Sequence, residues 1–439
     1  MAEKQEDKLQ KIVSLAKRRG FIYQGSEIYG GLAGTWDYGP LGVALKRNIT
    51  DLWWKMFVLE REDVYGLDAA ILMNSKVWEA SGHVDGFSDP LSECAKCKHR
   101  FRTDQLKDPN VCPDCGGALS EPRQFNMMFK THVGASEDSA AVSYLRPETA
   151  QGIFVNFKNI VDSFHPKLPF GIAQIGKAFR NEITPRDFIF RVRELEQMEV
   201  EYFVRGKDWE KSFEEWRNLI HRYIDTLGLD SNHVHELEVP PEDRAHYSKR
   251  TIDFEFDFPF GRKELYGLAY RTDYDLSKHQ EHSTVDLKYL DEETKERFVP
   301  HVIEPSLGVD RTVLAVLSDA YTEDEMGGET RTLLKLHPRI APVAVAVFPL
   351  LKNKPGLVKK AREVYDFVRQ TIPNVMFDDN GNIGKRYRRQ DEIGTPFCVT
   401  VDFDTLEDNT VTLRDRDTGE QTRMTIDALS EHFRLSLGI

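Results

Sequence analysis

Four of the five cysteines have the spacing of metal ligands. Cys94 and Cys97 form one CxxC motif and Cys112 and Cys115 form another, with fourteen residues between the pairs. Two such pairs favour tetrahedral zinc, and four thiolates leave no open position on the ion for water. We therefore predict a structural zinc site, against the alternative of four unrelated free thiols. Cys398 stands alone in an apolar segment and is predicted to be a core residue.

A second group of residues is rich in arginine, although the formal net charge of the chain is −13. The segment GKAFRNEITPRDFIFRVREL covers residues 176–195. Its pattern predicts two strands, over 170–179 and 188–205, joined by a polar loop that contains Pro185. The arginines of this predicted hairpin are Arg180, Arg186, Arg191 and Arg193.

Alternation along a strand would place Arg180 and Glu182 on one face of the hairpin, and Arg191 and Arg193 on one face of its partner strand. A guanidinium group binds two phosphate oxygens at once and stays charged, so this pattern favours an anion site. Glu182 is suited to orient a guanidinium or to accept hydrogen bonds from a ligand amine. The alternative is a solvated sheet face with weak ion pairs. Several such pairs beside one loop of an apolar sheet favour the anion site.

Two further motifs carry candidate ligand-binding residues. In IEPSLGVDR, Gly308 allows the backbone to approach a ligand, and Arg311 lies at the start of a predicted helix whose N-terminus can meet a phosphate. An ordinary helix cap is the alternative. In LRPETAQGIF, Arg146 and Glu148 either cap the helix that follows or, in the case of Glu148, hold a ligand ammonium. The spacing leaves both interpretations open.

The composition fits a globular protein of a few domains. Of the 439 residues, 40% are hydrophobic, and no apolar run reaches the ~20 residues of a membrane-spanning helix. The charged N-terminus lacks the apolar block of a signal peptide, so we expect a cytoplasmic protein with reduced cysteines. Residues 338–439 hold equal numbers of basic and acidic side chains, so the negative charge falls on residues 1–337. This acidity argues against indiscriminate nucleic-acid binding but leaves room for a local basic patch.

The predicted elements that must position these residues fall into two groups. Helices are predicted over 5–19, over 40–60 behind Pro40, and within 306–321. From Pro338 onward, strands and helices alternate over about a hundred residues, which predicts a separate α/β domain. Its elements are expected over 342–348, 356–371, 396–403, 410–414 and 426–437.

Taken together, the segments resemble the class II aminoacyl-tRNA synthetases, specifically the homodimeric glycyl-tRNA synthetases. RRGFIYQGSEIYGGLAGTWDYGPLG resembles motif 1 of that family, AFRNE with FRVRELEQMEVEYF resembles motif 2, and IEPSLGVDR resembles motif 3. ASGHVDGF, LRPETAQGIF and ELYGLAYRTDYDL also match family segments, so the resemblance covers nearly the whole chain.

The resemblance implies an α+β fold with an antiparallel catalytic sheet in residues 1–337. Motifs 1, 2 and 3 would lie at about 30–60, 172–204 and 303–318. A zinc-ribbon-like insertion is expected over 91–123 and an α/β anticodon-binding domain over 338–439. The expected partners are tRNA(Gly), glycine and a second copy of the chain, with no membrane association.

The resemblance also implies that Arg180, Glu182 and Arg311 are catalytic in glycyl-adenylate formation from ATP and glycine, with Mg²⁺ on the phosphates. Arg180 would bind the α-phosphate, and Arg311 would grip the bent triphosphate from the other side. The remaining implied ATP-binding residues are Asn181, Phe190, Arg191, Val192, Arg193, Glu194, Leu195, Glu264, Leu265, Gly308, Val309 and Asp310. The family usually has an aromatic ring where Leu195 stands, which weakens the expectation of an adenine platform.

For the amino-acid pocket, the resemblance implies carboxylates that grip the ammonium of glycine and leave no room for a Cβ. The implied residues are Arg102, Glu148, Leu195, Glu196, Gln197, Met198, Glu199, Glu304, Pro305, Ser306, Leu307 and Gly308. Arg100 is an alternative to Arg102. In the C-terminal domain, the basic stretch GNIGKRYRRQDEIGTPF makes Arg386, Arg388 and Arg389 candidate RNA contacts, with a solvated helix start as the alternative.

Two other functions stay open at this point. One is a class II synthetase for another small amino acid such as serine, proline or alanine; the EPS and RPETAQG segments favour glycine. The other is a non-catalytic, dimeric nucleic-acid-binding relative on the same fold. Such relatives tend to lose the phosphate-binding arginines, and Arg180, Arg191 and Arg311 are all present here.

Overall fold

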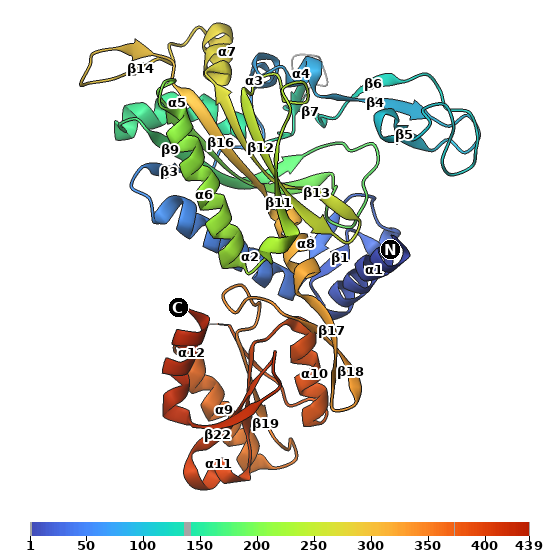
Figure 1. Cartoon of the computed structure of the whole chain (residues 1–439), viewed down its shortest axis with the longest axis vertical. Helices are drawn as coiled ribbons and strands as arrows, with labels where there is room; N and C mark the ends of the chain where they lie inside the picture. Colours follow the sequence, from blue (N-terminus) through green and yellow to red (C-terminus); the bar gives the residue numbers. More distant parts are fainter. Residues whose placement is uncertain (1, 136–141, 373, 439) are drawn as a thin grey trace.

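The molecule has two parts, each built around its own sheet (Figure 1). The computed structural model describes residues 2–135, 142–372 and 374–438. The larger part contains a seven-stranded sheet, and the smaller, C-terminal part contains a five-stranded sheet. The α+β fold predicted from the sequence is thereby confirmed. Within the described residues, no helix is both long and apolar enough to span a membrane.

The large sheet is antiparallel except at one edge, where β3 runs parallel to β9. Its strand order is β11-β12-β13-β16-β10-β9-β3. In that order the bounds are Val234–Glu238, Arg250–Phe258, Gly261–Thr272, His301–Gly308, Glu194–Val204, Phe170–Phe179 and Val64–Gly66.

Helices cover one face of this sheet completely. Successive side chains of a strand point to opposite faces, so Met198 and Val200 of β10 lie in the core, whereas Gln197 and Glu199 point the other way. Helices α2 (Pro40–Trp54), α6 (Trp209–Leu227) and α8 (Val309–Ala320) pack on the Met198 side. Residues Lys55–Leu59 extend α2 as a π-helical turn, close to the predicted end of this helix.

The opposite face is covered at one end only. There α5 (Ala150–Phe164) and α7 (Tyr274–Ser283) pack through Phe157 and Leu276 against Phe170 and Phe203. We call the uncovered end of this face the free face. It carries the polar side chains of β9, β10, β13 and β16.

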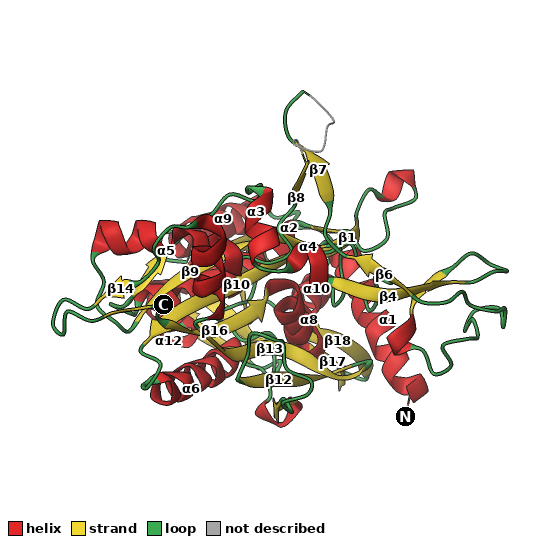
Figure 2. Cartoon of the chain, turned by 90° about the horizontal axis from the view of Figure 1, so that it is seen from above, coloured by secondary structure: helices red, strands yellow, loops and turns green. Residues whose placement is uncertain are grey.

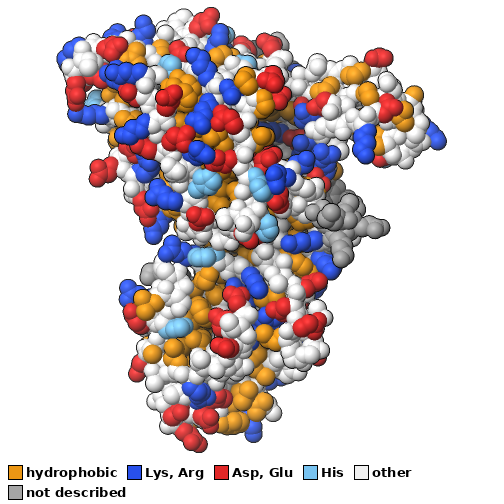
Figure 3. Space-filling view, viewed as in Figure 1, with side chains coloured by type: hydrophobic (Ala, Val, Ile, Leu, Met, Phe, Trp, Pro, Cys, Tyr) orange, Lys and Arg blue, Asp and Glu red, His pale blue; other side chains and the backbone are white. Residues whose placement is uncertain are grey.

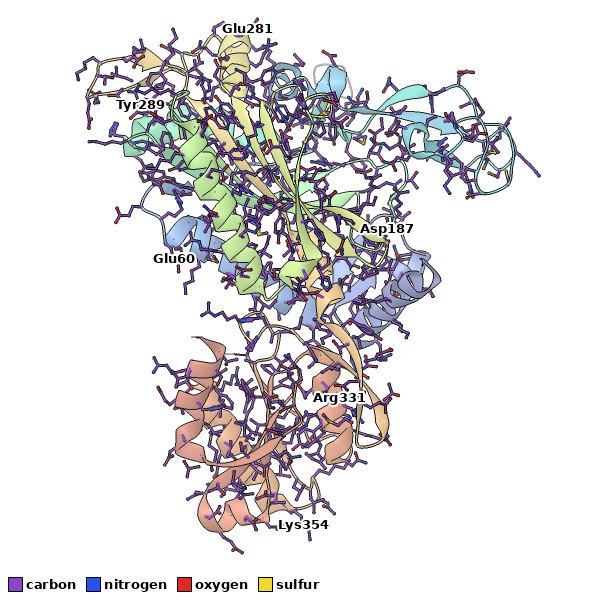
Figure 4. All side chains as sticks on the ribbon, in the orientation of Figure 1. Glu60, Asp187, Glu281, Tyr289, Arg331 and Lys354 are labelled. Atoms are coloured by element: carbon purple, nitrogen blue, oxygen red, sulfur yellow. The ribbon has the colours of Figure 1, made fainter. Side chains whose placement is uncertain are left out.

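The segment between β9 and β10 differs from the predicted hairpin. The second strand begins at Glu194 rather than at residue 188. Residues 188–190 are three consecutive buried side chains, which one face of a strand cannot accommodate. The chain therefore loops, with left-handed φ values of 59° at both Asp187 and Phe188 (Asp187 is labelled in Figure 4). Arg180, Glu182 and Arg191 consequently lie on this loop and not on paired strand faces.

An insertion projects from the larger part (Figures 1 and 2). It contains the three-stranded sheet β5-β4-β6, with bounds Arg100–Arg102, Ser88–Glu93 and Arg123–Asn126. The four paired cysteines lie on the loops of this insertion beyond β4 and β5. The fold therefore places the predicted metal ligands outside the free face of the large sheet.

The remaining elements of the larger part are short, apart from the first helix. The helices are α1 (Ala2–Arg19), α3 (Ser75–Ala80) and α4 (His83–Gly86). The strands are β1 (Ile22–Gln24), β2 (Trp36–Tyr38), β7 (Lys130–His132), β8 (Val142–Tyr144), β14 (Tyr289–Leu290), β15 (Arg297–Phe298), β17 (Tyr321–Met326) and β18 (Glu329–Leu334).

The smaller part is the α/β arrangement that the alternating pattern predicts. Its sheet has the order β20-β19-β21-β22-β23, with bounds Val375–Phe377, Val345–Pro349, Phe397–Val401, Thr410–Asp415 and Gln421–Thr425. Its helices are α9 (Pro355–Arg369), α10 (Ile383–Ile393), α11 (Phe403–Asp408) and α12 (Leu429–Leu437). Cys398 lies in β21 and is 1% exposed, which confirms it as a core residue.

A buried ion network joins the two parts. Arg331 on β18 is labelled at the junction in Figure 4, and its guanidinium lies 3.5 Å from the carboxylate of Asp391 on α10. Asp391 also accepts two hydrogen bonds from Arg414, at 2.8 and 3.0 Å. Because Asp391 is 1% exposed, its charge is compensated by these two arginines rather than by water.

We predict that Asp391→Ala destabilises the C-terminal part by about 3–5 kcal/mol, because it leaves two buried guanidinium groups without their carboxylate. Hydrogen–deuterium exchange should rise in the α10 and β22 peptides. Asp417→Ala is the matched control, because that carboxylate pairs with Arg416 but is 49% exposed. Equal exchange in both variants would contradict the prediction.

Candidate active site

A cavity of about 240 Å³ opens at the free face, between the ends of β10 and β16 and the loop after β9. It is lined by charged groups above an apolar floor. The charged residues are Arg102, Arg180, Glu182, Arg191, Glu264 and Arg311, and the apolar ones include Met127, Phe190, Val192, Leu195 and Leu265. The structure thus brings the predicted arginines together from three separate segments.

Two arginines of this cavity keep their charge available. Among the described residues, no carboxylate lies within 4.0 Å of the guanidinium of Arg180 or of Arg191. Arg180 is held by a 3.1 Å hydrogen bond from its Nε to the carbonyl of Pro147. Arg191 donates to the side-chain oxygen of Gln105 at 3.1 Å. An anion entering the cavity therefore meets two positive charges that no ion pair has cancelled.

Arg311 is held differently. Its guanidinium forms a 3.1 Å ion pair with Glu264 and lies 4.5 Å from the ring centroid of Phe190. The charge of Arg311 lowers the pKa of Glu264. Burial raises the pKa of Glu182, an effect that Arg191 and Arg180 oppose. The first cavity is therefore a guanidinium-rich site edged by two carboxyl groups.

A second cavity of about 270 Å³ adjoins the first and shares Arg180, Gln197, Glu264 and Ser306 with it. Its own lining is acidic and includes Glu148, Glu199 and Glu304. A positively charged ligand in this cavity would therefore lie next to an anion in the first one. Arg180 is the only arginine named in both linings.

The two outer carboxylates of the second cavity have different environments. Glu148 lies 3.5 Å from His83, and the charges of His83 and Arg271 hold its pKa below the usual range although burial opposes them. Glu304 receives a 2.7 Å hydrogen bond from Arg271, yet burial raises its pKa to about 8. Arg271 itself is fixed by two further bonds to Asp275, of 2.7 and 2.8 Å.

Glu199 acts as the central acceptor between these groups. It accepts hydrogen bonds from Ser306 at 2.6 Å and from Gln197 at 2.8 Å, and both the backbone N–H and the hydroxyl of Thr149 donate to it. These four donors occupy the carboxylate, whose pKa burial raises. Glu199 therefore fixes the positions of Ser306 and Gln197 in the cavity wall.

Several predicted site residues point away from both cavities. Met198, Leu307 and Val309 have side chains in the core, and Pro305 shares the strand face of Leu307. Glu194 is exposed and pairs with Lys177 at 3.1 Å. The prediction of consecutive pocket residues was therefore wrong for these side chains, because alternate residues of a strand face opposite sides of the sheet.

Four other predicted residues hold the backbone or another element. Both carboxylate oxygens of Asp310 are used, at 2.6 Å by the hydroxyl of Tyr38 and at 2.9 Å by the N–H of Glu196. The carboxylate of Glu196 pairs with Lys46 of α2 at 2.6 Å. Arg193 donates to the carbonyls of Glu182 and Ala33, and the N–H of Asn181 donates to the carbonyl of Met127. Gly308 lines the first cavity, as predicted.

The structure decides between Arg100 and Arg102 as the residue near the site. Arg102 lines the first cavity and forms ion pairs with Asp89 at 2.8 Å and Asp104 at 3.0 Å. Arg100 pairs with Glu93 outside the cavity, and its side chain is 60% exposed. Arg102 is therefore in reach of a ligand and Arg100 is not.

The sequence reasoning missed the far wall of the second cavity. Asp253, Tyr247 and Arg244 line it, and Arg271 lies behind Tyr247 with its guanidinium 3.8 Å from the ring centroid. Burial raises the pKa of Asp253 to about 7. Alternation in the segment ELYGLAYRTDYDL places Gly267, Ala269 and Arg271 on one face of β13, a signal that could have identified Arg271.

The four paired cysteines come together as the spacing predicts. All four sulfur atoms of Cys94, Cys97, Cys112 and Cys115 lie within 4.8 Å of one another. Two of the four residues, Cys94 and Cys112, are buried. This arrangement can supply four thiolate ligands to one ion.

The arginines of α10 divide into two kinds. Arg386 is 1% exposed, and its guanidinium donates to the backbone carbonyls of Pro349, Asp379 and Gly381. The predicted RNA contact is therefore wrong for Arg386, which instead closes a loop of the C-terminal part. Arg388 and Arg389 have side chains 32% and 28% exposed.

Comparison with known proteins gives the family. Residues 129–320 match the tRNA synthetase class II core domain (G, H, P, S and T), and residues 344–434 match the anticodon binding domain. The chain is 52% identical to the glycine–tRNA ligase of Clostridium acetobutylicum, with 98% of each chain covered. It is 53% identical to that of Thermobifida fusca, again over 98% of each chain.

The chain belongs to the glycine–tRNA ligase family. This confirms the resemblance inferred from the three motifs. Glycine–tRNA ligase of Treponema denticola is also similar, at 51% identity over 95% of this chain and 94% of its own. Within this ligase family member, the class II core match spans the strands that build both cavities, from β9 to β16.

The raised pKa of Glu304 predicts how stability depends on pH. Its folded-state pKa is about 8 and its ordinary value is 4.5, so between these values the folded state holds a proton that the unfolded state has released. Stability therefore falls as pH rises through this window, by up to about 1.4 kcal/mol per pH unit.

We expect Glu304→Gln to remove this slope, because glutamine has the same shape and can still accept from Arg271. Denaturant unfolding at pH 5, 6.5 and 8 should show a stability difference between variant and wild type that grows with pH in favour of the variant. Tryptophan fluorescence is a suitable signal, because all six tryptophans precede residue 338. A difference that does not change with pH would contradict the assignment.

Proposed function

We propose that this chain is a glycine–tRNA ligase that activates glycine with ATP and transfers it to the 3′ end of tRNA(Gly). One observation carries the proposal: a guanidinium-rich cavity and a carboxylate-rich cavity meet at Arg180. The reaction needs that geometry, because the triphosphate is an anion and the amino acid brings an ammonium group to it.

In the first step, Arg180 and Arg191 bind the phosphates of ATP, and Arg311 approaches them from α8. The carboxylate of glycine attacks the α-phosphorus in line; a carboxylate oxygen–phosphorus bond forms and the bond to pyrophosphate breaks. Glycine carboxylate is already ionised at neutral pH, so no general base is required. Positioning and charge neutralisation supply most of the acceleration. In the second step, a terminal ribose hydroxyl of the tRNA takes the glycyl group and AMP leaves.

Mg²⁺ prefers oxygen ligands and usually binds through one or two carboxylates together with substrate phosphates. Glu264 and Glu182 are the carboxyl groups at the edge of the first cavity, so they fit this donor set. The charge that Mg²⁺ brings would neutralise phosphate oxygens. Leu195 provides an apolar contact for the adenine ring in place of a stacking platform.

The second cavity fits the ammonium of glycine. Glu148 and Glu304 supply negative charge, and Glu199 holds Ser306 against the same space. A cavity that recognises the ammonium and excludes a Cβ selects the amino acid that has no side chain, whereas one methylene of hydrophobic contact is worth only ~1–3 kcal/mol. Arg102 is a further candidate substrate contact at the shared edge.

A homodimer and tRNA binding complete the proposal. Large apolar side chains are exposed around motif 1, with Ile28 at 89% and Tyr29 at 86%, which supports an interface there. On the surface shown in Figure 3, basic and acidic side chains are interspersed over both parts of the molecule. Local contacts such as Arg388 and Arg389 therefore remain our candidates for anticodon binding. A cytoplasmic location also remains a prediction, since free thiolates need a reducing compartment.

A panel of ATP–pyrophosphate exchange assays tests the function. We expect exchange with glycine and at least a hundredfold less with alanine, serine or proline, because a Cβ must displace side chains fixed by Glu199. A greater rate with any of these amino acids would assign the chain to another specificity. No exchange with any of them, in a folded protein, would favour the non-catalytic alternative.

Arg180→Ala is the matched test of the shared arginine. We expect exchange to fall by about three orders of magnitude or more, since the arginine is proposed to act on the transferring phosphorus. Sedimentation should show the same oligomeric state as the wild type. Normal exchange in this variant would rule out the role proposed for Arg180.

We also predict about one zinc ion per chain, held by the four cysteines. Metal analysis of the purified protein should find it, and Cys112→Ser should lose it and raise protease cleavage within 91–123. Cys398→Ser is the control, because that thiol is buried in the other part of the molecule. Zinc content below a tenth of an ion per chain would refute the site.

A further inference from the structure

The loop that carries Arg191 contains a small closed turn. The N–H of Arg186 donates to the carbonyl of Arg191 at 3.2 Å, and the N–H of Arg191 donates back at 3.3 Å. Asp187 and Phe188 make the reversal between them with left-handed backbone angles. The pairing brings two guanidinium groups to the same side, where each lowers the tendency of the other to stay protonated.

Gln105 lies opposite these two groups. Its side-chain oxygen accepts one hydrogen bond from Arg186 Nη2 and one from Arg191 Nη1, both at 3.1 Å. Two cationic donors at one atom require the oxygen, and not the amide nitrogen, in this position. Gln105 closes a 3₁₀ turn, Thr103–Gln105, in the insertion. The hydroxyl of Thr103 is buried and bonds Ser92 of β4 at 2.8 Å, which ties the turn to the insertion sheet.

We propose that Gln105 is a positioning residue for Arg191, which it aims at the triphosphate of ATP without cancelling its charge. The proposal rests on the function proposed above. An amide oxygen accepts a hydrogen bond but carries no net charge, so Arg191 stays fully cationic. By contrast, Arg102 is neutralised by Asp89 and Asp104, and Arg311 by Glu264.

The absence of this acceptor has a defined consequence. Without Gln105, the mutual repulsion of Arg186 and Arg191 is no longer offset, and the nearest carboxyl group that attracts Arg191 is Glu182. A guanidinium drawn to Glu182 would meet the phosphates at the wrong angle and with part of its charge cancelled. The effect should therefore appear in ATP binding and leave glycine binding unchanged.

The test compares Gln105→Leu with Gln124→Leu. Gln124 is also exposed and lies on β6 of the same insertion, where it accepts a 3.0 Å hydrogen bond from Ser88. Titration calorimetry of the full-length protein with ATP measures affinity without depending on catalysis. We expect Gln105→Leu to weaken ATP binding by about three- to tenfold, as for the loss of charge-assisted hydrogen bonds at an exposed site. The KM for glycine should stay within twofold, and Gln124→Leu should match the wild type.

A double-mutant cycle separates positioning from general damage. In an Arg191→Ala background, Gln105→Leu should cause no further loss of ATP affinity. An equal loss in both backgrounds, an ATP affinity of Gln105→Leu within 1.5-fold of the wild type, or an equal loss in Gln124→Leu would each overturn the proposal. Failure of glycine-dependent exchange in the wild type would count against the proposed function instead, because ATP binding is measured separately.

Discussion

The two-residue period of antiparallel strands is the constraint on which the site depends. On β10 it sends Met198 and Val200 into the core and Gln197 and Glu199 to the free face. Neighbouring strands in register then add Ser306 opposite Glu199. One sheet can therefore carry an apolar core on one side and a charged cavity on the other, with no loop needed to hold the charged groups.

The free face tolerates its buried carboxylates because their hydrogen bonds and charges are arranged in advance. Glu199 has four donors, and Glu304 has Arg271, whose own position is set by Asp275. Burial still raises the pKa of both Glu199 and Glu304. A ligand ammonium placed among them would favour their ionised forms, so part of the binding free energy comes from relieving an unfavourable burial. This is a means of recognising an amino acid that offers no side chain.

Much of this arrangement could be predicted from the sequence, and the rest could not for definable reasons. The CxxC pairs, the helix start at Arg311 and the C-terminal α/β part depend on local spacing, and the structure has each of them where the sequence indicated. The hairpin boundary was wrong because three adjacent apolar residues, 188–190, are buried by a loop and not by a strand. Arg386 was misjudged because a basic run predicts exposure, whereas its partners are backbone carbonyls distant in sequence. Contacts such as Gln105 with Arg191, 86 residues apart, have no signature in a single sequence.

The motif 1 segment is joined to both cavities by contacts that only the folded chain reveals. Tyr38 bonds Asp310 at the start of α8, and Lys46 of α2 pairs with Glu196 of β10. Asp310 also bonds the N–H of Glu196, so one carboxylate links three motifs. Arg311 follows Asp310 directly, and the direction of its side chain therefore depends on where Tyr38 holds the first turn of α8. If a second copy of the chain covers the exposed residues before Tyr38, dimerisation would restrict the same segment. The position of Arg311 would then be set partly by a surface that lies outside the active site.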